Sequence, residues 1–302
     1  MPLHPDARAF LDKMAGSPQP EDTSIEEFRR AASALVAVGP PLQIGRVADI
    51  AIAGGDSQPM NVRVYTPEGT GPFPVVVWVH GGSFVRGTLD MFDVGRRAFT
   101  KASGCIVVSV DQRLSPEAQF PAPLNDGYAA FTWAVSHAAE LGGDPALVGV
   151  AGESSGGNLA AALALMARDK SGPKPAFQLL VEPLLDARCD TPSMNELAQG
   201  YILTKSQLVW AYQQYAPNVP RDNPLISPLC ATNLRGLPPT VIVTLEYDPV
   251  RDDGELYAAR LAEAGVTVSN VRIAGMLHHF PGPDFIPTSA RLLRELIRGL
   301  SS

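Results

Sequence analysis

The chain has 302 residues, of which 45% are hydrophobic and 18% charged, the composition of a globular protein with a sizeable core. The formal net charge of -7 leaves no excess of Lys and Arg to neutralise phosphates, which argues against a nucleic-acid partner. No apolar run is long enough to span a bilayer, and residues 1–16 lack the apolar core of a signal peptide. We therefore expect a cytoplasmic protein with no membrane partner.

The three cysteines, Cys105, Cys189 and Cys230, are scattered and lie in or near apolar segments. Neither a disulfide framework nor a metal site follows from this spacing, and buried free thiols are expected. The sequence implies no metal and no cofactor.

Along most of the chain, short runs rich in Val and Ile alternate with segments whose apolar residues recur at helical spacing. A hairpin is expected at 46–52 and 61–65, followed by strands at 74–80, 105–111, 146–151, 177–182, 240–245 and 266–273. Helices are expected at 91–102, 126–141, 158–170, 254–264 and 289–299. This alternation predicts an α/β fold with a mostly parallel, eight-stranded sheet flanked by helices.

Two regions interrupt the alternation. Residues 1–45 precede the hairpin and include an expected helix at 24–38, and residues 187–224 contain four prolines around a helix-like segment at 205–215. We expect both to form one helical cap over the carboxyl edge of the sheet. The predicted organisation is therefore N-terminal cap helices at 1–45, a core at 46–186 and 225–302, and a cap insertion at 187–224.

The hexapeptide GESSGG at 152–157 lies between an expected strand and an expected helix. This context is typical of a nucleophile elbow, in which glycines allow strand and helix to pack closely around a strained serine, here Ser154. Chance alone would produce the motif in roughly one or two chains of this composition in ten. A plain Ser/Gly helix cap is the alternative, so the interpretation depends on the other residues that such a serine needs.

A serine nucleophile needs a histidine base, expected downstream of it. Of the five histidines, only His278 and His279 follow Ser154, in the expected loop between the last strand and the last helix. An isolated His-His pair would more often be exposed without a role, but here the position predicts His278 as the base.

The acid that orients the base should follow a strand and lie between Ser154 and His278. Asp248 meets both conditions, with Pro249 stiffening the turn after the strand at 240–245. Glu246 is the main rival, whereas Asp252 and Asp253 are expected to begin the next helix.

Backbone amides that stabilise an oxyanion are expected in the loop 80–84, after a strand. We expect the amides of Gly81, Gly82 and Ser155 to serve, with His80 orienting the loop by a side-chain hydrogen bond. A plain turn or a phosphate cradle are the alternatives, although no phosphate-binding glycine motif is present.

Five motifs together carry a family resemblance. They are HGG at 80–82, DQRLSPE at 111–117, GESSGGN at 152–158, EYDPVRD at 246–252 and GMLH at 275–278. Their order and spacing resemble those of bacterial hormone-sensitive-lipase-like carboxylesterases, from about residue 62 to the C-terminus. The resemblance implies an α/β-hydrolase fold with a helical cap, hydrolysis of carboxylic esters of short to medium acyl chains, and the catalytic triad Ser154, Asp248 and His278.

The chain departs from the family pattern at several positions. His279 replaces a glycine, Ser83 stands where a third glycine is usual, Gln112 where an aromatic residue is usual, and Glu182 where a tyrosine is common. Ser83 and Glu182 are expected to make the pocket more polar than in typical members.

Further expectations concern packing and the substrate. Asp111 and Arg113 are expected to form a buried ion pair under the loop 80–84. Four residues are candidates for lining the acyl or alcohol pocket, with ordinary packing as the alternative: Phe84, Tyr201, Leu203 and Trp210. An amidase, formamidase or lactonase with the same triad remains open, as does a ligand receptor on this fold, although such receptors typically lack the catalytic histidine. A homodimer is expected by analogy with the family.

Overall fold

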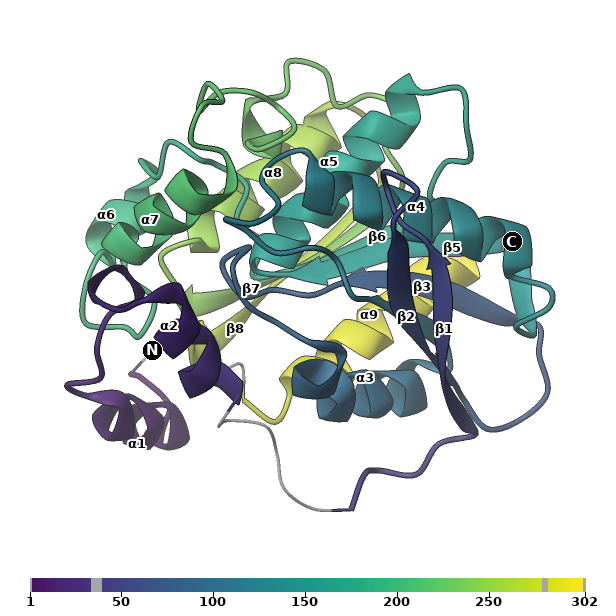
Figure 1. Cartoon of the computed structure of the whole chain (residues 1–302), viewed down its shortest axis with the longest axis horizontal. Coiled ribbons are helices and arrows are strands. Elements are labelled where there is room, and N and C mark those ends of the chain that lie inside the picture. Colours follow the sequence, from purple (N-terminus) through teal and green to yellow (C-terminus); the bar gives the residue numbers. More distant parts are fainter. Residues whose placement is uncertain (1, 34–39, 279–281, 301–302) are drawn as a thin grey trace.

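The computed structural model describes residues 2–33, 40–278 and 282–300. In these residues an eight-stranded sheet runs in the order β1-β2-β4-β3-β5-β6-β7-β8 (Figure 1). Its strands are β1 Arg46–Ala53, β2 Pro59–Thr66, β3 Phe73–Val79, β4 Ile106–Val110, β5 Gly143–Glu153, β6 Gln178–Val181, β7 Thr240–Tyr247 and β8 Val268–Leu277. Only the pairings of β1 with β2 and of β2 with β4 are antiparallel. The predicted mostly parallel, eight-stranded sheet is confirmed.

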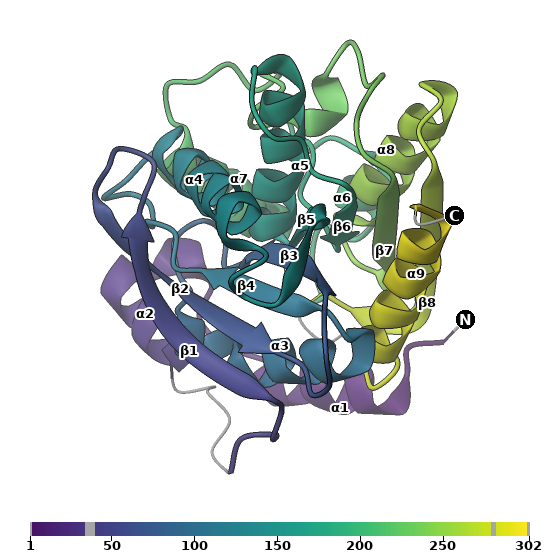
Figure 2. The ribbon, with the colours of Figure 1, turned by 90° about the vertical axis from the view of Figure 1, so that its right-hand side faces the viewer.

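Helices cover both faces of the sheet (Figures 1 and 2). One face packs against α3 (Leu89–Ser103) and α9 (Phe285–Leu300), and the other against α4 (Ala122–His137), α5 (Ser155–Asp169) and α8 (Arg251–Glu263). The central strands are buried on both faces, which explains why β3 reads as the continuous apolar run FPVVVWV. Two extensive apolar cores result, one on each side of the sheet.

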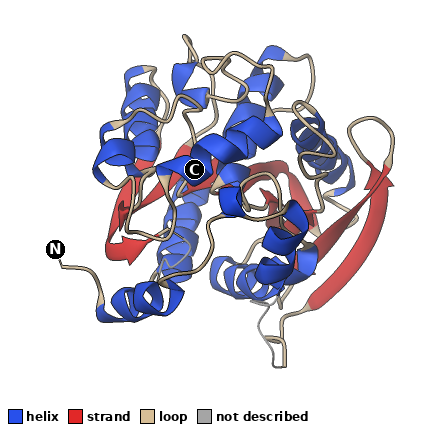
Figure 3. Ribbon diagram, turned by 60° about the vertical axis from the view of Figure 1, so that its left-hand side comes forward, coloured by secondary structure: helices blue, strands red, loops and turns tan. Residues whose placement is uncertain are grey.

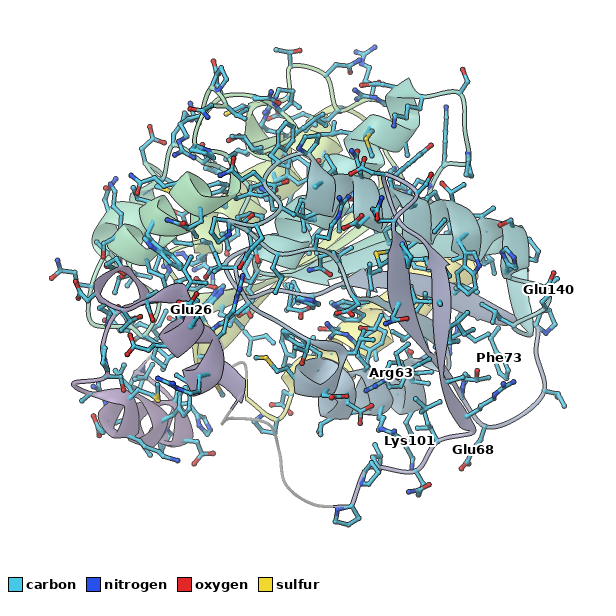
Figure 4. The ribbon with its side chains drawn as sticks, viewed as in Figure 1. Glu26, Arg63, Glu68, Phe73, Lys101 and Glu140 are labelled. Carbon is cyan, nitrogen blue, oxygen red and sulfur yellow. The ribbon has the colours of Figure 1, made fainter. Side chains whose placement is uncertain are left out.

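The β1–β2 hairpin projects along one edge of the sheet, where red strands extend beyond the blue helices (Figure 3). Arg63 on β2, labelled in Figure 4, forms ion pairs with both neighbouring elements. Its guanidinium lies 2.6 Å from Asp49 on β1 and 2.8 Å from Asp90 on α3. The opposite edge strand is β8, parallel to β7.

Two groups of short helices gather at one end of the molecule (Figure 1). The first is α1 (Pro5–Met14), the 3-10 turn η1 (Pro20–Asp22) and α2 (Ile25–Ser33), and the second is α6 (Pro192–Glu196) and α7 (Lys205–Tyr215). The ring of Phe28 on α2 meets that of Trp210 on α7 edge to face, with centroids 5.6 Å apart. The N-terminal segment and the segment after β6 therefore pack together.

The elements differ from the sequence predictions mainly at their ends. Helix α1 lies within the expected N-terminal cap helices at 1–45, but its bounds were not predicted; its N-cap, His4, is not among the residues preferred there. Helix α2 begins at Ile25, but positions 34–38 of the helix expected at 24–38 lie outside the described residues. Cys105 and Cys189 are buried free thiols, as expected, whereas Cys230 is a free thiol that is only partly buried.

Candidate active site

The chain turns sharply between β5 and α5, and Ser154 lies on that turn with φ 55° and ψ -123°. A non-glycine residue adopts this backbone only under strain. The flanking glycines make it feasible, because a Cβ atom on Gly152 would lie 2.1 Å from the Gly156 carbonyl oxygen. A Cβ atom on Gly156 would lie 2.1 Å from the Val79 carbonyl oxygen. The turn thus has the geometry of a nucleophile elbow.

Three buried side chains from separate parts of the chain meet at this turn. Ser154 Oγ lies 2.9 Å from Nε2 of His278, and Nδ1 of His278 lies 2.8 Å from Oδ2 of Asp248. The second oxygen of Asp248 accepts a hydrogen bond from the Val250 amide at 3.0 Å, which fixes the carboxylate. An imidazole hydrogen-bonded on one side to a hydroxyl and on the other to a carboxylate can take the proton of that hydroxyl.

A second carboxylate faces the same imidazole. Oε2 of Glu182, which follows β6, lies 3.6 Å from Nδ1 of His278, and both side chains are buried. Burial disfavours the imidazolium, but the charges of Asp248 and Glu182 outweigh that effect and raise the pKa of His278 to about 9. The sequence singled out Glu182 only as a departure from the family pattern, with no indication of this contact.

Glu246, the rival acid, has a different position. Its carboxylate accepts a hydrogen bond from the Gly275 amide at 2.7 Å and so holds strand β8 beside β7. Asp252 and Asp253 lie in the first turn of α8, as expected. Of these four acids, only Asp248 is hydrogen-bonded to His278. His279 lies outside the described residues.

The loop after β3 approaches the elbow, but its amides are not all available. The Gly81 amide donates to Oε1 of Glu153 at 3.1 Å, which argues against Gly81 as an oxyanion donor. The amides of Gly82 and Ser83 make no hydrogen bond with any described residue. Ser155 is the first residue of α5, so its amide has no partner within the helix.

Hydrogen bonds of Glu153 hold this loop in place. The Glu153 carboxylate accepts hydrogen bonds from Arg96 at 2.8 and 3.0 Å and from the indole nitrogen of Trp78. The guanidinium of Arg96 also stacks over the Trp78 ring, 4.3 Å from its centroid. Nothing in the sequence signalled this network, because Glu153 and Arg96 are 57 positions apart.

His80 orients the loop as expected. Its Nδ1 lies 2.7 Å from the Gly81 carbonyl oxygen and donates to it. Burial lowers the pKa of His80 to about 4, so the ring is neutral.

The expected ion pair between Asp111 and Arg113 is wrong. Arg113 instead binds Asp126 on α4 at 2.8 Å and Asp56 in the β1–β2 turn at 2.7 Å. Arg113 therefore joins the hairpin to the core, a long-range contact that a local motif could not predict.

A cavity of about 860 Å³ lies among α1, η1, α2, the loop after β3 and the segment before α7. Among the four expected pocket residues, only Tyr201 lines it. Phe84 stacks on Tyr215 with centroids 4.1 Å apart, Leu203 is buried in the core, and Trp210 packs on Phe28. The contacts of Phe84, Leu203 and Trp210 are those of ordinary packing, the alternative to lining a substrate pocket.

Metal-ligating atoms come together at one place in the described part of the chain. Atoms of Glu182, Asp248 and His278 lie within 4.8 Å of one another. Both ring nitrogens of His278 are already hydrogen-bonded, one to Ser154 and one to Asp248. The cluster therefore has the arrangement of a proton-transfer site.

A family model described as the alpha/beta hydrolase fold matches residues 76–282. The carboxylic ester hydrolase LipN of Mycobacterium tuberculosis is 40% identical over 248 residues, which cover 80% of this chain and 65% of that protein. An arylesterase of Saccharolobus solfataricus is 35% identical and covers 99% of this chain and 98% of its own.

Solved structures agree with these sequence comparisons. A mutant of the esterase rPPE, complexed with (S)-Ac-CPA, has a TM-score of 0.92 at 34% identity and covers 99% of this chain and 98% of that one. The chain therefore belongs to the α/β-hydrolase family, among its carboxylic ester hydrolases. The resemblance to hormone-sensitive-lipase-like esterases is thereby confirmed. In the described residues, no helix has both the length and the apolarity to cross a membrane.

Proposed function

We propose that this protein is a serine carboxylesterase that hydrolyses small-molecule esters of short to medium acyl chains through Ser154, His278 and Asp248. The observation that carries the proposal is the continuous hydrogen-bonded relay from the strained Ser154 hydroxyl through His278 to Asp248. The membership among carboxylic ester hydrolases favours an ester over an amide or a lactone.

The first half of the reaction acylates the enzyme. Nε2 of His278 takes the Ser154 proton as Oγ attacks the ester carbonyl carbon, and Asp248 stabilises the imidazolium that forms. The tetrahedral intermediate then collapses, the bond to the alcohol oxygen breaks, and His278 returns the proton to the leaving alcohol.

The second half frees the acid. A water molecule gives a proton to His278 and attacks the acyl carbon, and collapse of the second intermediate restores the Ser154 hydroxyl and releases the carboxylic acid.

We assign the oxyanion donors to the amides of Gly82 and Ser155, together with that of Ser83. The assignment of Gly82 and Ser83 is supported because their amides have no hydrogen-bond partner among the described residues. The Gly81 amide is not assigned, because Glu153 already accepts its hydrogen bond. Each such donor contributes typically 10²- to 10³-fold to turnover.

The domain organisation follows from the same proposal. Residues 1–45 and 187–224 act as one cap that bounds the substrate cavity, over a core at 46–186 and 225–302. We also propose a homodimer through the edge of β8, by family resemblance, and residence in the cytoplasm, as the sequence leads us to expect. Sedimentation velocity tests the dimer. If the edge of β8 forms the interface, substitution of exposed residues along β8 should convert the dimer to monomers.

A panel of matched esters and amides tests the activity. Wild-type protein should hydrolyse esters of two- to eight-carbon acyl chains much faster than the corresponding amides, and Ser154→Ala should abolish both rates while remaining folded. Equal hydrolysis by the folded Ser154→Ala variant would refute the proposal.

A further inference from the structure

The cavity of about 860 Å³ is lined by a positively charged residue, Arg86. It lies beside the loop 80–84, which we call the oxyanion loop. The backbone of Arg86 is fixed against that loop, since its amide donates to the Gly82 carbonyl oxygen at 3.0 Å. Its side chain lines the cavity together with Phe28, Tyr201 and Gln207.

The Arg86 guanidinium makes no hydrogen bond and no ion pair with any residue that the structure describes. The guanidinium lies over the face of the Phe28 ring, whose centroid lies 4.1 Å from Cζ. A stacked guanidinium keeps its N–H donors free at the edge of its plane. The ring therefore holds the cation in place without neutralising it.

The other charged groups lining the cavity do not serve as its partner. The Glu27 carboxylate accepts from the Ser24 amide and hydroxyl at 3.1 and 3.0 Å and lies 3.9 Å from Arg30. Asp12 is exposed to solvent. Burial lowers the pKa of Arg86 to about 10, so it stays protonated at neutral pH.

Ser154, Asp248 and His278 do not line the cavity, but one of its lining residues contacts the loop beside them. Gln207 lines it, and Nε2 of Gln207 donates to Oγ of Ser83 in the oxyanion loop at 3.4 Å. The charge of Arg86 is also near enough to His278 to lower the pKa of that imidazole, against the larger effects of Asp248 and Glu182. A substrate with its ester at Ser154 would pass Ser83 and Gln207 to reach Arg86.

We propose that Arg86 binds an anionic group of the substrate, so that the preferred esters carry a second, ionised carboxylate, as monoesters of dicarboxylic acids do. This inference rests on the proposed esterase function. A carboxylate matches the fork of guanidinium donors in a bidentate geometry, and it would give Arg86 the anionic partner that neither Glu27 nor Asp12 provides. A neutral ester would leave the half-buried cation without a partner.

The test compares esters that differ only in this charge, at pH 7.5. On the acyl side, monomethyl adipate is matched with methyl adipamate, and on the alcohol side, 4-acetoxybutanoate with 4-acetoxybutanamide. The readout is a ratio of kcat/KM values. It compares the ester that carries a carboxylate with the matched ester that carries a neutral carboxamide in its place. Wild-type protein should favour the anion by about 10-fold or more in at least one pair, the size expected for a hydrogen bond to a charged group.

Substitutions assign the preference to Arg86. Arg86→Leu should lower the ratio by about 10-fold or more, and Arg86→Lys should keep part of it, since a point charge remains. Arg30→Leu is the matched control, because Arg30 lines the same cavity but faces Glu27, and its ratio should equal that of wild type. If Arg86→Leu does not fold, competitive inhibition by free adipate, compared in wild type and Arg86→Lys, gives the same answer.

A ratio that is the same in wild type and Arg86→Leu for both pairs overturns the inference, as does adipate inhibition that Arg86→Lys leaves unchanged. Hydrolysis that still requires Ser154 would in that case leave the proposed function standing. Hydrolysis of all four esters by Ser154→Ala would instead refute the proposed function itself.

Discussion

The Glu153 carboxylate accepts a hydrogen bond from the Gly81 amide at 3.1 Å and is itself held by Arg96. The residue just before the proposed nucleophile therefore fixes the loop that carries the proposed oxyanion donors. One carboxylate therefore connects the elbow with the loop, in an ion pair with the buried Arg96.

Removal of this carboxylate should affect both stability and turnover. Glu153→Ala leaves Arg96 buried without its partner, and breaking a buried pair of this kind costs about 3–5 kcal/mol of the free energy of unfolding. Turnover should also fall, since the loop loses its anchor. Urea unfolding and kcat measure the two effects.

Glu153→Gln separates the two effects, because it keeps an acceptor for the Gly81 amide and loses only the charge. The exposed Glu140, labelled far from the cap in Figure 4, provides the control. Glu140→Ala should change the free energy of unfolding by no more than about 0.5 kcal/mol. Equal stability of Glu153→Ala and Glu140→Ala would show that the network is not structural.

The second carboxylate beside the base predicts an alkaline activity profile. His278 must be neutral to accept the Ser154 proton, and its pKa is raised to about 9, so kcat/KM should fall as pH decreases through that value. Glu182→Gln removes one of the two negative charges, so the rising limb of the profile should move to lower pH by about 1 unit or more. An unshifted profile in a folded Glu182→Gln variant would mean that Asp248 alone sets this pKa.

The choice between the two strand-end acids can be tested directly. Asp248→Asn should lower kcat by about 10⁴-fold, because the amide cannot stabilise the imidazolium and favours the wrong tautomer of His278. Glu246→Gln should retain most of the activity, since Glu246 holds the Gly275 amide and not the base. The reverse ranking of these two variants would reassign the acid.

A glycine substitution at the elbow can be compared with one in an open position of a helix. Gly152→Ala places a Cβ atom 2.1 Å from the Gly156 carbonyl oxygen, so we expect a loss of at least about 1–3 kcal/mol in the free energy of unfolding, together with loss of activity. Gly95 in α3 has no atom within 4 Å of such a Cβ. Gly95→Ala should therefore stabilise the protein by about 0.5–1 kcal/mol, because alanine favours a helix. Thermal unfolding of both variants measures the contrast.

The sequence predicted the features that depend on local pattern. Period and composition were sufficient for the parallel sheet, and the motif around Ser154, the late position of His278 and the strand-end Asp248 led to three side chains that the structure brings together. The contact that argues against Gly81 as an oxyanion donor could not be predicted in this way. The Gly81 amide is engaged by a side chain 72 positions away, and no local spacing reveals such a contact.

Long-range contacts account for the other differences. Arg113 pairs with Asp126 and Asp56 across the fold, and Arg86 is notable only because the folded chain leaves it without a carboxylate partner among the described residues. A charged residue in the middle of the loop sequence SFVRGT was the only signal in the sequence, and it does not distinguish a paired arginine from a cation that lines a cavity.

The most direct test of the central claim is covalent labelling of the protein with a fluorophosphonate, followed by peptide mass spectrometry and an ester-hydrolysis assay. We predict one adduct, on Ser154, whose extent matches the loss of activity, and no adduct in the Ser154→Ala variant. An adduct on another residue, or full activity after stoichiometric labelling of Ser154, would contradict the account.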